Sequence, residues 1–143
     1  MRSIYHGLMA LYNGKHYQAT ISDQNVILKS DRCEFDGMYT KEIDIENITS
    51  IFYVDNKVLY KGLTANIVEI GDGNIKIRFK KGIATMYWEF EDYGRLLGNK
   101  IISLDECDEV YMLKTKFRDF EIKGDNKIFF NSYEELEDMV IFD

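Results

Sequence analysis

Closely spaced carboxylates are the first side chains in this sequence that could do chemistry, because a general acid and a general base need two such groups near each other. Three pairs stand two residues apart: Glu34 and Asp36, Glu89 and Glu91, and Glu106 and Asp108. The chain has 25 acidic residues among 143, so pairs of this kind arise freely by chance. We therefore interpret them as solvated surface groups.

The other reactive side chains form no recognisable catalytic or metal-binding pattern. His6 and His16 are the only histidines, and no spacing places them with Cys33 or a carboxylate as metal ligands. No serine has the sequence context of an activated nucleophile. Gly71-Asp72-Gly73 lies between two predicted strands, whereas a phosphate-binding loop precedes a helix. We predict that the protein is not an enzyme and has no cofactor or metal.

Clustered acids with interleaved tyrosines predict a protein-binding surface instead. The formal net charge of -7 disfavours nucleic acid as a direct ligand and suits a basic protein partner. The predicted contact residues are Tyr87, Glu89, Glu91, Asp92, Tyr93, Asp105, Glu106, Asp108 and Glu109. A basic stripe could contact phosphates, but beside this net charge we interpret it as a solvated strand face; it comprises Lys76, Arg78, Lys80 and Lys81.

The elements that must position these residues come from an internal repeat of about 50 residues. Leu11-Tyr12-Asn13-Gly14 and Leu59-Tyr60-Lys61-Gly62 each open a similar run of an alternating strand, a polar turn and a second apolar strand. Each copy closes on an acidic turn followed by an apolar strand, at 46–53 and at 105–112. Such self-similarity is typical of a duplicated supersecondary unit.

Alternation of apolar residues predicts the individual strands. In 63–70 the apolar phase flips after Ile67, which predicts a bulge or bend. A single helical turn is expected at 44–47, a strand with buried Trp88 over 84–90, a connecting loop over 91–99, and a strand over 100–104. The third, incomplete element is a hairpin of 120–122 with 128–130, and Ser132 begins a capped terminal helix.

These elements predict an all-β protein of two SH3-like, strongly bent antiparallel meanders packed together, with a C-terminal hairpin and one short helix. We expect one compact unit over 1–143, with repeats at 1–56 and 57–114 and the hairpin and helix at 115–143. Cys33 and Cys107 do not occupy matching positions and are interpreted as free thiols. Without a signal peptide or a membrane-spanning run, we expect a cytoplasmic protein that does not contact membranes.

The two Tyr-X-Gly openings, each followed by a two-strand meander and a close such as Glu46-Asn47-Ile48-Thr49-Ser50-Ile51, resemble the duplicated SH3-like repeats of small bacterial immunity proteins. These proteins belong to polymorphic or contact-dependent growth inhibition toxin systems. The resemblance covers about residues 4–114 and implies a non-catalytic antitoxin that binds one toxin domain, often a nuclease. No interface residue carries over, because family members use different surfaces.

We therefore expect an immunity protein that covers the active-site groove of a basic toxin domain, such as an RNase or DNase, with an acidic surface. The alternative is an SH3-like or Tudor-like adaptor that binds a peptide or nucleic acid through an aromatic groove. An adaptor needs several aromatic side chains at one barrel mouth, whereas a toxin blocker needs a broad acidic face.

Overall fold

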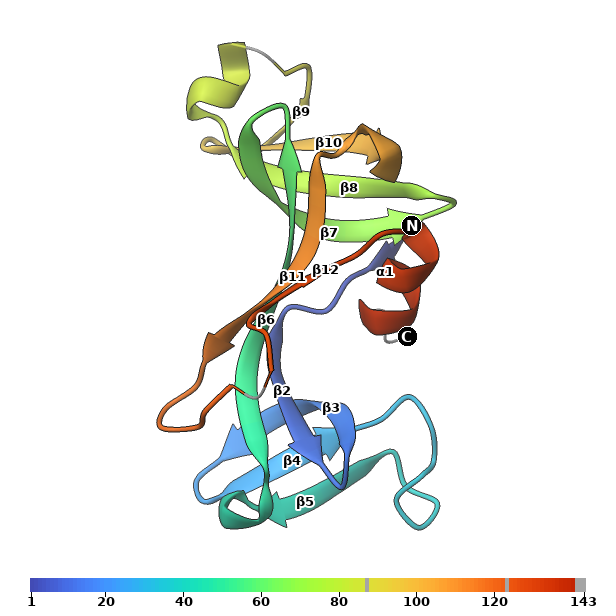
Figure 1. The fold of residues 1–143 in the computed structure, drawn as a ribbon, viewed down its shortest axis with the longest axis vertical. Helices are drawn as coiled ribbons and strands as arrows, with labels where there is room; N and C mark the ends of the chain where they lie inside the picture. Colours follow the sequence, from blue (N-terminus) through green and yellow to red (C-terminus); the bar gives the residue numbers. More distant parts are fainter. Residues whose placement is uncertain (87, 123, 141–143) are drawn as a thin grey trace. The chain divides into compact units, whose positions relative to one another are not determined.

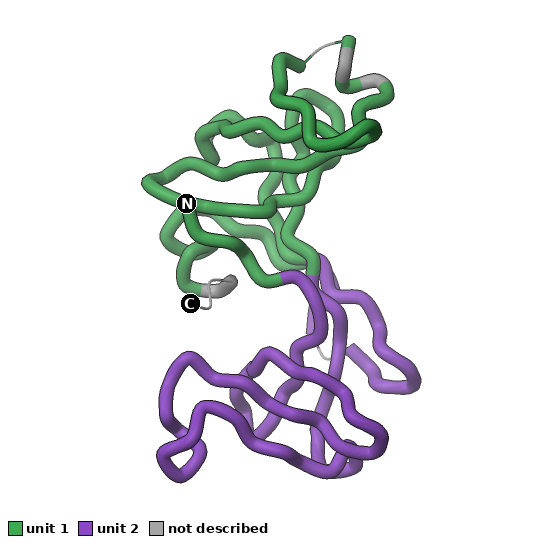
Figure 2. The backbone as a smooth tube through the Cα atoms, turned by 180° about the vertical axis from the view of Figure 1, so that it is seen from behind, with its two compact units in different colours: residues 1–5, 55–112, 127–142 green, residues 6–54, 113–126, 143 purple. Residues whose placement is uncertain are grey.

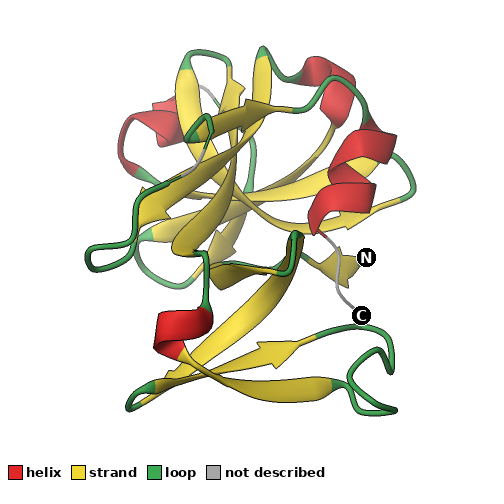
Figure 3. Cartoon of the chain, turned by 60° about the horizontal axis from the view of Figure 1, so that its bottom comes forward, coloured by secondary structure: helices red, strands yellow, loops and turns green. Residues whose placement is uncertain are grey.

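A computed structural model describes residues 1–86, 88–122 and 124–140, and it confirms the all-β class (Figure 1). The strands are β1 (Arg2–Ser3), β2 (Gly7–Tyr12), β3 (Lys15–Ser22), β4 (Asn25–Lys29), β5 (Thr40–Asp44), β6 (Ser50–Tyr60), β7 (Leu63–Gly71), β8 (Asn74–Lys80), β9 (Glu91–Tyr93), β10 (Leu97–Ser103), β11 (Glu109–Lys116) and β12 (Lys127–Phe129). The helical elements are the 3-10 turns η1 (Ile45–Asn47), η2 (Gly82–Met86) and η3 (Leu104–Glu106), and the helix α1 (Tyr133–Val140). Figure 3 shows that strands make up most of the regular structure and that the helical segments are short.

The chain divides into two compact units (Figure 2). Unit 1 comprises Met1–Tyr5, Asp55–Met112 and Lys127–Phe142, and unit 2 comprises His6–Val54 and Leu113–Asn126. The division between Val54 and Asp55 lies inside β6, two residues before the repeat boundary that the sequence predicts at 56/57. Each unit also takes a segment from elsewhere in the chain, so the repeats and the units overlap without being identical.

Unit 2 is a meander that closes on its first strand. β2, β3, β4 and β5 pair in sequence order, all antiparallel, and after η1 the first half of β6 returns to pair with β2. This is the element order of an SH3-like barrel. Alternate residues of the strands point inward, so the core consists of Ala10, Tyr17, Ala19, Val26, Leu28, Ile48 and Ile51, with Phe117 added from the later segment.

Unit 1 repeats the same order with the second half of β6, β7, β8, β10, η3 and β11. β9 adds an outer strand to β10, and β1 pairs with β7. The pairing of β7 with β8 shifts register between Ile67 and Glu69. The bulge expected from the apolar phase flip is therefore confirmed.

The opening motifs form equivalent hairpin turns. Asn13 and Gly14 have φ values of 51° and 78°, and Lys61 and Gly62 have 47° and 79°. Both central residues are therefore left-handed, as in the type I′ turn that matches strand twist. The closing segments correspond as well. The N–H of Thr49 donates to the carbonyl of Leu11 at 3.1 Å, and the N–H of Asp108 donates to that of Leu59 at 2.9 Å.

The segment after β8 differs from the expected strand. Gly82–Met86 forms a 3-10 turn, and the N–H of Trp88 donates to the carbonyl of Ala84 at 2.8 Å. Ala84 and Trp88 are both buried, but Met86, which an alternating strand would bury, is 73% exposed. A spacing of four residues places two side chains on one face of a helical turn as well as of a strand. The predicted burial of Trp88 in the core is confirmed, but the prediction of a strand over 84–90 is wrong.

Two further segments depart from the sequence pattern. The predicted loop at 91–99 contains β9 and the start of β10, which pair through Leu97 and Tyr93. The predicted strand at 120–122 lies outside the strands, and β12 pairs with β11 instead. The terminal helix is confirmed: the N–H of Glu135 donates to the Ser132 hydroxyl at 3.2 Å, and Leu136 is fully buried.

Candidate functional site

The first predicted acidic group lies on and beside β9, the outer strand of unit 1. Glu89, Glu91 and Asp92 are exposed, and Tyr93 is 49% exposed. Asp92 forms an ion pair of 2.6 Å with Lys81, while no cationic partner is recorded for Glu89 or Glu91 among the described residues. This edge therefore presents carboxylates and one aromatic ring to solvent. Tyr87, also predicted here, lies outside the described residues.

The second acidic group surrounds η3. Glu106 has a structural role, since its carboxylate accepts from the N–H of Ser103 at 2.8 Å and caps the turn. Glu109 pairs with Lys127 at 3.5 Å. Asp105 and Asp108 are exposed, and neither has a recorded ion pair within the described part of the chain. Asp105 and Asp108 are therefore the carboxylates of this group best placed to meet a partner.

The two acidic groups lie beside different parts of β10. Glu91 stands opposite Asn99, within the first half of the strand, and η3 follows Ser103, its last residue. Asn99 and Ser103 are four residues apart along the strand, which is about 13 Å. The acids thus form two separate charged rims within unit 1.

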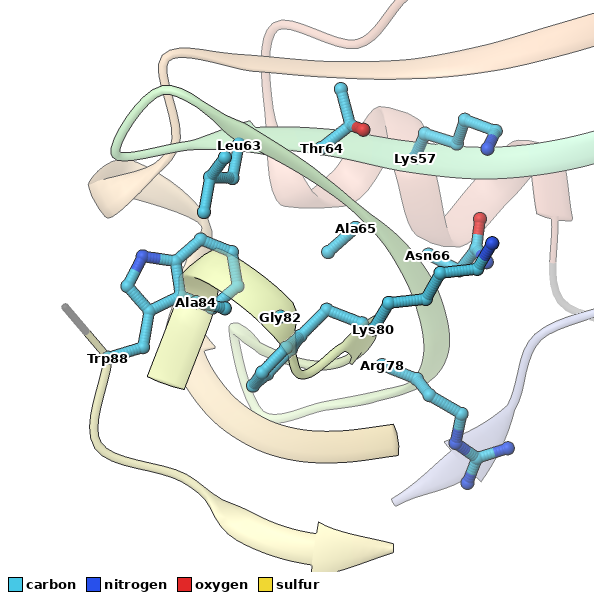
Figure 4. A pocket seen from close by; sticks show the side chains of 11 residues that line it. Lys57, Leu63, Thr64, Ala65, Asn66, Arg78, Lys80, Gly82, Ala84 and Trp88 are labelled. Carbon is cyan, nitrogen blue, oxygen red and sulfur yellow. The ribbon is translucent and has the colours of Figure 1, made fainter. Parts of the chain in front are cut away.

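The basic stripe on β8 lies beside β10. Arg78 stands opposite Asn99, donates from Nε to its side-chain oxygen at 3.0 Å, and places its guanidinium 3.7 Å from the centre of the Tyr93 ring. Lys80 stands opposite Leu97 and is exposed. Both side chains line a hollow of about 460 Å³ in unit 1, with Lys57, Asn66 and Trp88 among its other lining residues (Figure 4).

Sequence reasoning missed Lys57 and Asn66 as site residues, because only strand register places them beside Arg78. Lys57 on β6 pairs with Asn66 on β7, which pairs with Arg78 on β8. A comparison of the two repeats could have identified Lys57. Its matching residue in the first repeat is Met9, which pairs with Gln18 and is buried. A lysine in place of a core methionine marks a difference in surface chemistry between the copies.

A second hollow, of about 300 Å³, lies in unit 2 and is lined by aromatic and charged side chains. Its residues are Tyr12, Asn13, Lys15, Tyr17, Glu34, Phe35, Asp36 and Lys41. The Tyr17 and Phe35 rings lie 5.2 Å apart, and the Lys41 ammonium lies 5.7 Å from the centre of the Tyr12 ring. This hollow combines ring faces with carboxylates, which is the composition that attracts cations.

Glu34 is the carboxylate of the aromatic hollow that accepts side-chain hydrogen bonds. It accepts hydrogen bonds from the Tyr17 hydroxyl at 2.5 Å and from the Ser30 hydroxyl at 2.7 Å, and these bonds lower its pKa. Burial, followed by the bond to Glu34, raises the pKa of Tyr17 to about 12. The pair therefore stays ionised at Glu34 and protonated at Tyr17 over the neutral range.

The remaining reactive side chains do not converge. In the described residues no group of three or more His, Cys, Asp or Glu side chains is placed to hold a metal. His16 lies edge-on to Phe52 at 5.9 Å, and burial and the charge of Lys114 lower its pKa. Cys33 and Cys107 are free thiols, as expected.

Comparisons with protein-family models, with curated proteins and with solved structures found no match. No helix among the described residues is long and apolar enough to span a membrane.

Proposed function

We propose that the protein is a non-catalytic immunity protein that binds a basic bacterial toxin domain, of nuclease type, and blocks it. Its acidic rims on unit 1 would face the positively charged groove in which the toxin holds phosphates. Complementary charge accelerates encounter and penalises wrong partners, and the exposed Tyr93 beside the first rim offers an aromatic anchor.

The observation that carries this proposal is a comparison of the two closing turns. Both turns use the same backbone bonds, yet Asp108 and Glu109 of the second repeat stand where the first repeat has Thr49 and Ser50. The first repeat closes without these two charges, so the turn does not require them, whereas Glu106 caps the second turn. Two acids that the turn does not need, both in the second copy, support selection for a basic partner.

The test is co-expression with the toxin domain encoded by the neighbouring reading frame, followed by binding measurements with the purified toxin domain. We expect rescue of growth and an affinity that falls as salt rises. Asp105→Lys/Asp108→Lys should weaken binding by at least tenfold. Asp31→Lys/Asp119→Lys in unit 2 changes the net charge equally and should leave affinity within about twofold. Equal effects of the two double variants would refute the placement of the interface.

The aromatic hollow of unit 2 favours a second candidate, an adaptor that binds a cationic peptide side chain. Tyr12, Tyr17 and Phe35 supply ring faces, and Glu34 and Asp36 supply negative charge. In the free protein Lys41 lies over the Tyr12 ring, so a peptide cation would displace it. Binding of lysine-rich or arginine-rich peptides that is lost in Phe35→Ala and retained in Asp105→Lys/Asp108→Lys would favour this candidate over the first.

A further inference from the structure

The hollow of unit 1 is basic, although the chain as a whole is acidic. Among the described residues, its charged lining side chains are Lys57, Arg78 and Lys80, and none of the lining residues is a carboxylate. The rest of its lining is polar or apolar, from Leu63, Thr64, Ala65, Asn66, Phe79, Gly82, Ala84 and Trp88. The hollow therefore has a positive charge in a chain whose net charge is -7, and an anionic ligand would account for this difference.

Among the described residues, none of the three cations of the hollow has a carboxylate within ion-pair distance. Lys81 and Lys127, by contrast, pair with Asp92 and Glu109. Like charges held close together without an anion repel each other, so an anion bound here would lower the energy of the folded protein.

Arg78 is held in place before any ligand arrives. The bond from its Nε to Asn99 and the stacking on Tyr93 fix the plane of the guanidinium, and within the described part of the chain its terminal nitrogens form no hydrogen bond or ion pair. A planar guanidinium with free donors is suited to bidentate contact with phosphate oxygens. Prior ordering also reduces the entropy lost when a ligand binds.

The spacing of the cations indicates the size of the anion. Lys57 and Arg78 stand on β6 and β8, two strand spacings apart through Asn66, or about 10 Å between their backbones. In Figure 4 the side chains of Lys57 and Lys80 extend toward the same side of the hollow as Asn66, and Arg78 extends separately. Lys57 and Lys80 are therefore placed to bind one anionic group, and Arg78 is placed to bind a second.

We propose that this hollow binds the diphosphate group of a small phosphorylated molecule. Lys57 and Lys80 would hold one phosphoryl group, with Asn66 donating from its amide, and Arg78 would hold the other. This proposal does not rest on the proposed toxin-binding function, although Tyr93 belongs to both surfaces. A long nucleic acid is disfavoured, because the exposed carboxylates of β9 and η3 would repel phosphates that extend beyond the hollow.

Trp88 provides a direct test, because it is the single tryptophan of the chain and lines the hollow. Titration with inorganic pyrophosphate should give a saturable change in Trp88 fluorescence with one site and a Kd of about 1 mM or tighter. Sodium chloride at matched ionic strength should not reproduce the change. The absence of saturation, or an equal response to chloride, would overturn the proposal.

Variants locate the site. Arg78→Gln and the double variant Lys57→Gln/Lys80→Gln should each weaken pyrophosphate binding by at least tenfold. Lys29→Gln is the matched control, since Lys29 pairs with Gln18 in unit 2 as Arg78 pairs with Asn66 in unit 1; it should change Kd by less than twofold. Unfolding midpoints would confirm that each variant is folded. Equal weakening in Lys29→Gln, or tighter binding of a glutamate-rich peptide or single-stranded DNA than of pyrophosphate, would refute a diphosphate site.

Discussion

Gly98→Ala should destabilise the protein through one defined steric conflict. Gly98 lies in β10, paired on one side with Phe79 of β8 and on the other with Asp92 of β9. A β-carbon there would lie 2.7 Å from Cδ2 of Phe90 and 2.9 Å from Cζ of Phe79. Normal carbon contacts begin at about 3.5 Å, so the neighbouring rings would have to move by more than half an ångström.

The surroundings leave little room for that movement. Phe79 lies edge-on to Trp88 with ring centres 4.6 Å apart, and to Phe90 with centres 5.3 Å apart. Strands on both sides hold the Gly98 backbone. Overpacking of a core costs about 1–3 kcal/mol, and the gain of about 0.4–1 kcal/mol from a less flexible unfolded chain offsets part of it. We expect a net loss of about 1–2 kcal/mol.

Urea unfolding followed by Trp88 fluorescence measures this loss, and a thermal midpoint lower by about 3–6 °C should accompany it. Gly71→Ala is the comparison variant, because the nearest atoms to its β-carbon would be Cα and Cγ of Met1, each at 3.2 Å, a milder conflict that a shift of a few tenths of an ångström relieves. Phe90→Leu should relieve part of the conflict in a double variant. Gly98→Ala as stable as the parent, or strict additivity with Phe90→Leu, would refute the packing argument.

Three further outcomes follow from side-chain contacts. Because the pKa of Glu34 is lowered in the folded protein, its contribution to stability should be present above the unfolded pKa of about 4.5 and lost as pH falls through the lower folded value; Tyr17→Phe should flatten this acid dependence in urea titrations. Burial, then the neighbouring acids, raises the pKa of Cys107 to about 11, so a thiol reagent at pH 8 should label exposed Cys33 quickly and Cys107 only after unfolding. Ser132→Ala removes the cap of α1 and should cost about 1 kcal/mol in a urea titration, whereas Ser132→Asp should retain most of the stability.

Features that depend on neighbours in sequence were predictable. The repeat, its tight turns and the bulge in β7 follow from Asn-Gly chemistry and from apolar alternation, which act over a few residues. The terminal helix follows from its capping pattern. In each case the local preference agrees with the final packing, so short-range reasoning is sufficient.

Features that depend on distant neighbours were not predictable. Buried residues at positions 84 and 88 fit a strand and a helical turn equally, and only the exposure of Met86 distinguishes them. β9 carries Glu91-Asp92-Tyr93, which has little strand preference, and it forms because the edge of β10 is available for pairing. The hollow of unit 1 requires the register of three strands, which sequence spacing alone does not determine.

The two copies also show how one backbone came to carry two kinds of surface. Tyr12 and Tyr60 end equivalent strands, but Tyr60 is 2% exposed and lies edge-on to Trp88 at 5.0 Å, whereas Tyr12 is only half-buried and lines the open hollow of unit 2. The segment that contains Trp88 follows β8 and fills the corresponding space in unit 1. Trp88 covers the equivalent ring, so the binding that we propose for unit 1 uses its charged strand faces, whereas the second candidate function uses the aromatic hollow of unit 2. Asp105, Asp108, Lys57 and Lys80 have no ion-pair partner among the described residues, so their substitution should alter the proposed binding without altering the fold.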